Sequence, residues 1–307
     1  MSDFAPIVLF VYNRLKHTKS TVKALQKNIY ASKSELFIFS DAPKNNENKA
    51  EVELVRSYLK DISGFKNVSI VERNSNFGLS KSIESGVTEV IDNYGKAIIL
   101  EDDIVTAPYF LRYMNESLDL YEFDSSVANI SGYTIPNNGE LPETWFSKGA
   151  NSWGWGTWKE SWNLYTPDPQ IIFNQLKSSG KMEELDNYID VDFTQLFEDY
   201  IDNKISAWDI VWTSICFMNN KYTLYPKESL VLNIGNDGSG TNCIVDSSFD
   251  SHVIYLRPIK VSRVKVIDNE DYIKLYKSYV RGNRNIIYFL IRKYVKKYLK
   301  ITRNFFK

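Results

Sequence analysis

The chain has 307 residues, enough for one large domain or two closely packed ones, and 43% hydrophobic with 24% charged residues is an ordinary globular composition. Its net charge of −1 argues against a general nucleic-acid-binding protein. The charge is unevenly distributed: residues 281–307 hold nine Lys or Arg and no Asp or Glu, so the remainder is acidic overall.

Cysteine usage and the apolar runs bear on the compartment. The only two cysteines, Cys216 and Cys243, do not form a CxxC pair, so we expect neither a disulfide framework nor a zinc site, and a reducing compartment fits. The apolar run near the N-terminus is too short for a signal peptide, and no run is long enough to span a bilayer. We expect a cytoplasmic protein.

The first 125 residues alternate between strand and helix patterns. Apolar, β-branched runs predict strands at 6–12, 35–41, 68–73 and 97–100, and helical spacing predicts helices at 17–28 (with Thr18 as a candidate cap), 48–62, 78–94 and 108–121. This alternation predicts an α/β fold with a mostly parallel sheet flanked by helices.

Polar clusters follow these strands. Ligands of such sheets bind at the carboxyl ends of the strands. Asn13-Arg14, Asp41, residues 74–78 and the triplet 101–103 all follow predicted strands, so we expect them to converge on one edge of the sheet.

After residue 125 the rhythm changes. We expect a strand at 127–135, a Gly/Trp-rich loop and helix at 150–163, polar-faced helices over 167–203, a buried helix at 206–220, and a strand, turn and glycine-rich loop over 222–242. The acids of the polar helical stretch are expected to be solvated: Asp190, Asp192, Glu198, Asp199 and Asp202.

The triplet Glu101-Asp102-Asp103 ends an apolar strand. Carboxylates are costly to bury unless they are paired or bind a metal, so the alternatives are a solvated turn or a cation site. Mg²⁺ and Mn²⁺ suit such ligands and usually complete their shells with water and substrate phosphates. No Walker loop is present and no GxGxxG follows the first strand, which disfavours a P-loop NTPase and a Rossmann dehydrogenase.

Several motifs occur in a telling order: PIVLFVYNR, LFIFSDAP, NFGLSKSIESGV, IILEDDIVTAPYF, ANSWGWGTWKESW, AWDIVW and NIGNDGSGTN. Together, over about residues 6–245, they resemble GT-A fold glycosyltransferases of the inverting N-acetylglucosaminyltransferase I type and bacterial family-2-like sugar transferases. The resemblance implies a catalytic domain over 1–265, with a nucleotide-sugar half (1–125) and an acceptor half (126–265), followed by a helical, basic tail over 266–307.

The resemblance also implies roles for individual residues. Asp103, in a DxD-type motif, would bind the metal, Asp102 and Glu101 would lie at the donor's ribose or sugar, and Asp209 would be the general base. Arg14 and Asp41 would hold the nucleotide, Asp41 through the uracil ring. Further donor contacts are expected from Asn13, Gly78, Ser80, Trp153, Trp155, Asp237 and Ser239. Bacterial relatives often carry a His where this chain has Asn242, which leaves a second protein ligand to the metal unassigned.

Three segments keep two interpretations. Asp209 lies between Trp208 and Ile210, and this apolar frame would raise its pKa; the alternative is a helix N-cap. In the Gly/Trp run we expect Trp153 and Trp155 at the ligand, and Trp158 and Trp162 on one packed helix face. The loop 235–240 is either a mobile cover for the donor or a surface turn.

The tail has apolar residues at helical spacing with Lys and Arg between them. This pattern predicts an amphipathic helix over 284–307 lying on an anionic membrane, at the inner face of the cell membrane. The alternative is a helix packed on its own domain or on another subunit of a homo-oligomer.

The resulting hypothesis is an inverting, metal-dependent enzyme that uses Mn²⁺ or Mg²⁺. It would move a hexosyl or N-acetylhexosaminyl group from a UDP-sugar to a hydroxyl of a glycan or lipid-linked saccharide, in surface polysaccharide assembly. The alternatives are a non-catalytic sugar-binding protein of the same fold, a metal-dependent nucleotidyltransferase, and a retaining mechanism. The nucleotidyltransferase is disfavoured because VYNRLKHTKS has no glycine.

Overall fold

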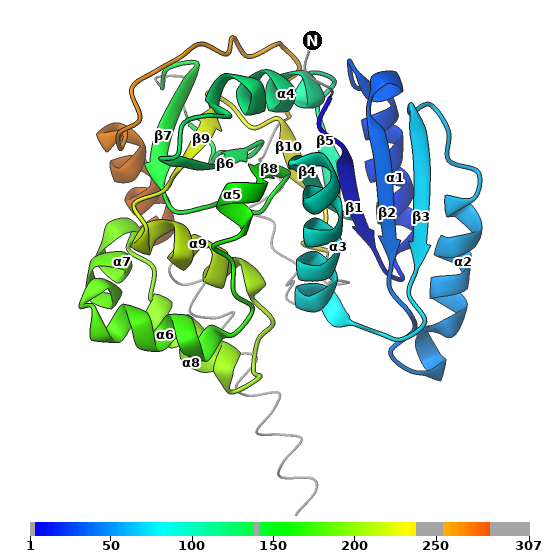
Figure 1. Ribbon diagram of the computed structural model, residues 1–307, viewed down its shortest axis with the longest axis horizontal. Coiled ribbons are helices and arrows are strands. Elements are labelled where there is room, and N and C mark those ends of the chain that lie inside the picture. The colour runs from blue at the N-terminus through cyan, green and yellow to red at the C-terminus, as the bar shows by residue number, and fades with distance from the viewer. Residues whose placement is uncertain (1–3, 138–140, 238–253, 283–307) are drawn as a thin grey trace, which may run out of the picture.

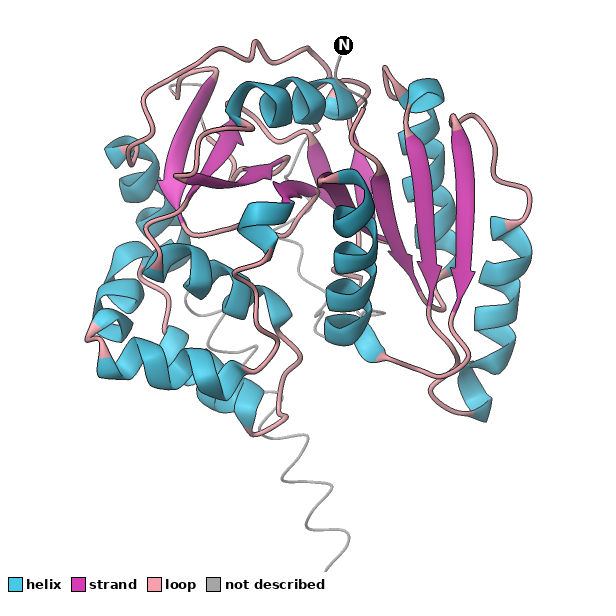
Figure 2. Ribbon diagram, viewed as in Figure 1, coloured by secondary structure: helices cyan, strands magenta, loops and turns pink. Residues whose placement is uncertain are grey.

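The computed structural model describes residues 4–137, 141–237 and 254–282. A mixed eight-stranded sheet in the order β3-β2-β1-β4-β8-β6-β9-β7 runs through the molecule, with helices on both faces (Figures 1 and 2). A separate pair of short strands, β10 and β5, lies beside it. The predicted fold class, an α/β protein with a mostly parallel sheet flanked by helices, is confirmed.

The first half of the chain forms the parallel part of the sheet. β1 (Ile7–Val11), β2 (Glu35–Ser40), β3 (Asn67–Glu72) and β4 (Lys96–Glu101) pair in parallel. Between and after them lie α1 (Leu15–Gln26), η1 (Ala31–Lys33), η2 (Asn46–Asn48), α2 (Lys49–Leu59), α3 (Gly78–Tyr94), β5 (Ile104–Thr106) and α4 (Phe110–Tyr121). The predicted strands and helices of this half are confirmed to within a few residues, but α1 begins before Thr18, whose hydroxyl donates to the Arg14 carbonyl inside the helix.

The second half extends the sheet with shorter strands. β8 (Trp155–Trp158) lies antiparallel between β4 and β6 (Val127–Ser131), β9 (Tyr222–Pro226) runs parallel to β6, and β7 (Thr144–Lys148) forms the edge. The helices are α5 (Lys159–Trp162), α6 (Pro169–Ser178), α7 (Lys181–Ile189), α8 (Phe193–Ile201) and α9 (Trp208–Met218). β10 (Val231–Asn233) pairs antiparallel with β5.

Each face of the sheet has its own apolar core. Successive residues of a strand point to opposite faces, so Ile7 and Leu9 of β1 join the core under α1, α2 and α4, while Val8 and Phe10 join the core under α3 and α9. Burial on both faces explains why this strand is a continuous apolar run rather than an alternating one.

The Gly/Trp-rich run begins as a loop over residues 150–154 and ends in a helix, as predicted, but a central strand, β8, lies between them. Trp155 is 1% exposed, and its ring lies 5.7 Å from those of Trp162 and Trp208, so Trp155 is a core residue and not a ligand contact. Gly156 faces the other side, where an added Cβ would lie 2.9 Å from Met114 Cε. The Gly–Trp alternation is therefore the period of a strand with one crowded face.

Trp158 and Trp162 are buried, as predicted, but they do not share a helix face. Trp158 ends β8 and its indole N–H donates to the Leu118 carbonyl, while the Trp162 indole donates to the Thr88 hydroxyl in the opposite core. The chain does not enter α5 until after Trp158, so the spacing of four residues spans a strand end and a helix.

Residues 254–282 pack against the second half of the molecule. Residues 270–282 are helical, and the Tyr272 ring lies 5.4 Å from Trp145 of β7 and 5.1 Å from Tyr225 of β9. The predicted interfacial helix, 284–307, lies outside the described residues. Within the described part of the chain, no helix is both long and apolar enough to cross a membrane.

Candidate functional site

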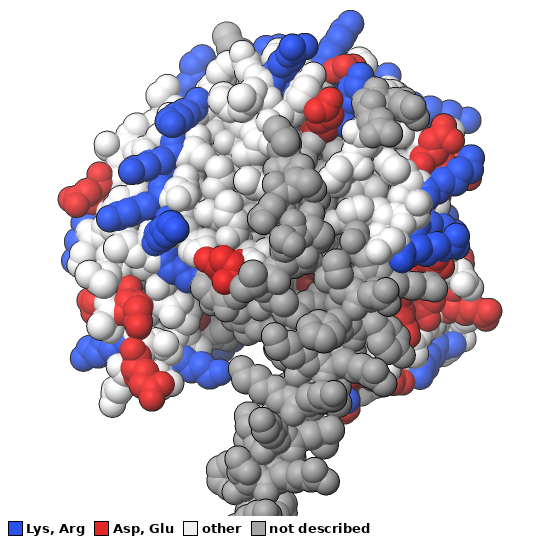
Figure 3. Space-filling view, turned by 180° about the vertical axis from the view of Figure 1, so that it is seen from behind, with Lys and Arg blue, Asp and Glu red and all other residues white. Residues whose placement is uncertain are grey.

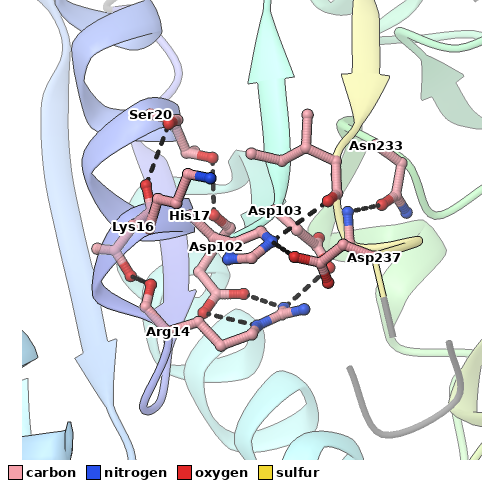
Figure 4. Close-up of polar contacts among 12 residues, drawn as sticks. Arg14, Lys16, His17, Ser20, Asp102, Asp103, Asn233 and Asp237 are labelled. Atoms are coloured by element: carbon pink, nitrogen blue, oxygen red, sulfur yellow. Dashed lines mark hydrogen bonds and ion pairs between the residues drawn. The ribbon is translucent and has the colours of Figure 1, made fainter. Parts of the chain in front are cut away.

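The acid triplet lies at the carboxyl edge of the sheet, where β4 ends beside β1. Asp102 and Asp103 are buried, so a solvated turn is the wrong interpretation. Arg14, which follows β1, forms ion pairs with both: its guanidinium contacts Asp102 through two nitrogens, and its Nη2 lies 2.8 Å from Asp103 Oδ2 (Figure 4). One cation thus pairs with two buried carboxylates and offsets part of the cost of burying their charges.

Burial and crowding set the electrostatics of this site. Burial raises the pKa of Asp102 to about 6, against the opposing charge of Arg14. Burial, followed by the charges of Asp103, Asp209 and Asp102, raises the pKa of Glu101 well above its usual range. Burial alone would lower the pKa of Arg14, but the charges of Asp102 and Asp103 outweigh this effect and raise the pKa above its usual value. Arg14 is therefore a fixed positive charge beside Glu101 and Asp102, two carboxyl groups whose pKa values are raised.

Asp209 approaches the same site from the other half of the molecule. It is the second residue of α9, and the N-cap position is Ala207, so the N-cap interpretation of Asp209 is wrong. Burial raises its pKa against the opposing effect of the backbone N–H groups of Asp209 and Ile210, which confirms the predicted direction of the shift. The charge of Asp209 is also one of the causes that raise the pKa of Glu101, so Asp209 lies within electrostatic range of the acid triplet.

Among the acids of the helical stretch, Asp192, Glu198 and Asp202 are exposed, as predicted, whereas Asp199 and Asp190 have protein partners. Asp199 was expected to be solvated but is buried, and it accepts hydrogen bonds from Gln195 Nε2 and Lys204 Nζ, each at 3.1 Å. Asp190 forms an ion pair with Arg281. Both therefore act as structural groups.

Asp41 directly follows β2 and holds the start of α3. Its Oδ1 accepts from the backbone N–H groups of Ala42 and Phe77, each at 2.9 Å, and its Oδ2 accepts from Gly78 N at 2.9 Å and Asn76 Nδ2 at 3.1 Å. Gly78 has a φ of +73°, and open space surrounds the position its Cβ would take. Asp41 thus shapes residues 76–78 beside the edge of the sheet, and its contact with uracil stays a prediction.

The remaining predicted donor contacts are spread around this edge. The Ser80 hydroxyl lies 3.0 Å from the Tyr200 hydroxyl and joins α3 to α8. Trp153 is partly exposed, and its ring packs edge-to-face on Tyr133 with centroids 4.6 Å apart. Asn13 is partly buried next to Arg14, and Ser239 lies outside the described residues.

The segment Asn233–Asp237 follows β10 and approaches the acid pair, Asp102 and Asp103. Its main partner is His17, which was not predicted. Asp237 Oδ2 lies 3.2 Å from Nε2 of His17, a buried residue of α1 (Figure 4). Sequence reasoning did not select His17. The available signal was its position three residues after Arg14, within one helical turn of a residue already assigned to the site.

The residues at this edge fit a divalent cation. The donors near Asp103 are carboxylate oxygens, which Mg²⁺ and Mn²⁺ prefer. A Cβ on Gly235 would lie 2.2 Å from Asp103 Oδ2, so glycine leaves this oxygen room that any other residue would fill. Across the described ranges, no group of three or more His, Cys, Asp or Glu side chains is arranged to hold a metal.

Comparison with known proteins adds distant structural matches. No protein-family model and no curated protein matches this chain. Among solved structures, the mannosyltransferase PcManGT from Pyrobaculum calidifontis, in complex with GDP-Man and Mn²⁺, matches at 12% identity and a TM-score of 0.36 over 51% of this chain and 45% of its own. S. aureus TarS matches at 12% identity and 0.43 over 76% and 37%, and its 1–349 fragment at 12% and 0.42 over 74% and 58%.

This chain therefore spans between about a third and three fifths of the lengths of those structures. At these TM-scores the matches carry no argument about activity, and the activity has to be argued from this chain's own residues.

Proposed function

We propose that this protein is an inverting, metal-dependent glycosyltransferase that moves a sugar from a UDP-sugar to a hydroxyl of a glycan or lipid-linked saccharide. One observation supports this above the others. At the carboxyl edge of one sheet, Asp102 and Asp103 both form ion pairs with Arg14, while Asp209, a separate carboxylate of raised pKa, approaches from the opposite half. A transferase of this kind needs a cationic region for the diphosphate and a carboxylate for the acceptor.

The nucleotide-sugar side is assigned to the first half of the chain. Asp103 would hold Mn²⁺ or Mg²⁺, and a bound cation would stabilise the negative charge that develops on the leaving diphosphate. Arg14 would share its guanidinium between the acid pair and the diphosphate oxygens, since its Nη1 is buried without a hydrogen-bond partner among the described residues. Residues 76–78, shaped by Asp41, and Ser80 would line the nucleotide.

The acceptor side is assigned to Asp209. As the acceptor oxygen attacks the anomeric carbon, Asp209 would take the hydroxyl proton, and the bond from that carbon to the diphosphate oxygen would break. A single displacement of this kind inverts the anomeric configuration. The raised pKa of Asp209 suits the role, because a base is more effective when its pKa approaches the working pH.

The Asp209→Asn variant tests this assignment. Asparagine keeps the shape and hydrogen-bonding ability of aspartate but takes no proton, so turnover should fall by ~10²–10⁴-fold while donor affinity is kept. Steady-state kinetics with a panel of UDP-sugars, and calorimetry with UDP, measure the two quantities. Near-normal turnover in a folded variant would place the base elsewhere, and a product of retained configuration would remove the single displacement.

The pH dependence supplies a second readout of the same residue. Asp209 acts as a base only when it is ionised. The turnover rate should therefore be maximal above the pKa of Asp209 in the folded protein and should fall as the pH drops through that pKa. Because burial raises that pKa, the acid limb of the turnover profile should lie above the usual aspartate value of about 3.9. The residual turnover of Asp209→Asn should lack this limb, and an unchanged limb would assign it to another group.

A further inference from the structure

The segment Asn233–Asp237 is delivered to the acid pair by a short strand pairing. In the antiparallel register of β10 with β5, Asn233 lies opposite Ile104, the residue directly after the triplet. The Ile234 N–H donates to the Asp103 carbonyl at 2.9 Å. Asn233 Oδ1 accepts from the Gly235 N–H at 2.8 Å, which turns the chain back toward the site (Figure 4). The segment therefore has a fixed start beside Asp103.

Gly235 brings the segment against the Asp103 carboxylate itself. Only 2.2 Å separates Asp103 Oδ2 from the point that a Cβ at position 235 would occupy, a separation that real Cβ atoms do not adopt. The same Oδ2 is the atom that Arg14 contacts at 2.8 Å. Asp103 Oδ2 thus lies between the Arg14 guanidinium and the backbone at Gly235. Any movement of that backbone changes the space around the oxygen.

His17 is the side chain of α1 that holds the segment Asn233–Asp237 in place. Its Nε2 lies 3.2 Å from the Ile234 carbonyl oxygen and 3.2 Å from Asp237 Oδ2. Both partners are acceptors, so the geometry requires a hydrogen on Nε2 that the two share. One buried imidazole therefore ties both the start and the end of the segment to the first turn of α1.

The same face of α1 also holds the acid pair. Thr21, one helical turn after His17, is fully buried and donates its hydroxyl hydrogen to the Asp102 carbonyl at 2.8 Å. Residues four apart lie on one helix face, so His17 contacts the segment and Thr21 contacts the end of β4 from a single rigid element. α1 thereby sets the distance between the two sides of the site.

We propose that His17 is a positioning residue that fixes Asn233–Asp237 against Asp103 and so sets the geometry in which Asp103 meets the metal and diphosphate. The ligand in this statement rests on the proposed function, whereas the hold of His17 on the segment does not. A ligand-binding carboxylate needs neighbours that keep it in one place, and loss of such neighbours commonly weakens metal binding by ~10–100-fold.

Two substitutions in the full-length protein test the proposal. His17→Leu keeps the bulk and removes the N–H, so hydrogen exchange at the segment's amides should accelerate by ~10-fold or more, and UDP–Mn²⁺ affinity should fall by ~10-fold. His17→Gln retains an N–H donor of similar reach and should restore most of both. Thr21→Val, which breaks the contact of the same helix with Asp102, is the matched control and should leave exchange of the segment unchanged.

The outcomes separate this proposal from the proposed function. Unchanged exchange in His17→Leu, or equal defects in His17→Leu and His17→Gln, would overturn the positioning role. Loss of affinity without faster exchange would overturn it as well, because His17 would then act on the ligand directly. If the wild-type protein binds no UDP with Mn²⁺, the glycosyltransferase assignment fails, and the exchange comparison still decides whether His17 holds the segment.

Discussion

Glu101 is placed where its charge destabilises the fold, because it is partly buried next to other acids of the candidate site. Burial, together with the charges of Asp103, Asp209 and Asp102, disfavours its ionised form. Groups placed for a reaction often carry such a cost, which is recovered when the charge is removed.

Glu101→Gln should therefore raise the melting temperature at neutral pH. The substitution keeps the side-chain shape and removes the cost that Glu101 carries on folding, whether it buries its charge or takes up a proton, and in proteins of 150–250 residues each kcal/mol gained raises the melting temperature by about 2–4 °C. Thermal unfolding in the presence of a chelator measures the change. Glu89→Gln on the exposed face of α3 is the control and should have little effect; equal shifts, or a loss of stability in Glu101→Gln, would contradict the crowding.

At the residue scale, the chemistry at strand ends was predictable and the side chains that support it were not. Asp102, Asp103 and Arg14 follow apolar strands, and parallel strands end at one edge, so their convergence follows from pattern alone. His17 was not foreseen because its partners, Ile234 and Asp237, are more than 200 residues away in the chain. Trp155 was misplaced because a Gly/Trp run is compatible with either a ligand loop or a crowded strand.

At the element scale, α3 is held by a carboxylate from another strand rather than by a cap of its own. Phe77, at its N-cap position, supplies no side-chain hydrogen bond, and Asp41, the residue after β2, accepts hydrogen bonds from the N–H groups of Phe77 and Gly78 instead. A negative charge at a helix N-terminus is also favoured by the helix dipole.

Asp41→Ala should therefore destabilise the protein by about 1–3 kcal/mol, because it leaves partly buried N–H groups without acceptors. Chemical denaturation measures this loss. If Asp41 also contacts uracil, UDP affinity measured well below the unfolding transition should fall while acceptor binding is kept. A variant as stable as the wild type would contradict the capping role, and unchanged UDP affinity would remove the uracil contact.

The predictability of the elements follows their length and surroundings. The four parallel strands and their helices were predictable because each strand contains a short apolar run, which is buried on both faces in β1 and β4, and each helix has an apolar stripe. The sequence predicts no strand at β5, β7 or β10 and a loop at β8, because these segments lack a distinctive apolar pattern and become strands by pairing with their neighbours in the sheet. β10 is defined by its antiparallel pairing with β5, and this pairing places it at the site.

At the scale of the whole molecule, charge is distributed unevenly. Figure 3 shows a row of basic side chains along one side of the face opposite to that of Figure 1. On α1, the exposed residues Lys16, Lys19 and Lys23 lie along one helix face, and the helix has no acidic residue in its first turn. Residues 284–307 carry eight further Lys or Arg in a chain that is otherwise acidic.

This distribution leads to a prediction about membranes. Each Lys or Arg near an anionic bilayer contributes about 1 kcal/mol, so deletion of residues 284–307 should lower binding to anionic vesicles by at least ~10-fold. Turnover of a soluble acceptor should be unchanged, since every residue assigned to the site precedes the deletion. Vesicle sedimentation, with neutral vesicles as the control, measures the first quantity. Loss of folding on truncation would instead indicate a helix packed on protein.

The central claim is that Asp103 links a divalent cation to a nucleotide diphosphate, and calorimetry of UDP binding with and without Mn²⁺ tests it most directly. The wild-type protein should bind UDP more tightly with Mn²⁺, and Asp103→Ala and Asp103→Asn should both lose that gain, because a neutral side chain no longer attracts the ion. Asp61→Ala, at an exposed position, should keep it. UDP–Mn²⁺ affinity that is unchanged in folded Asp103 variants would contradict the assignment of this edge as the metal–nucleotide site.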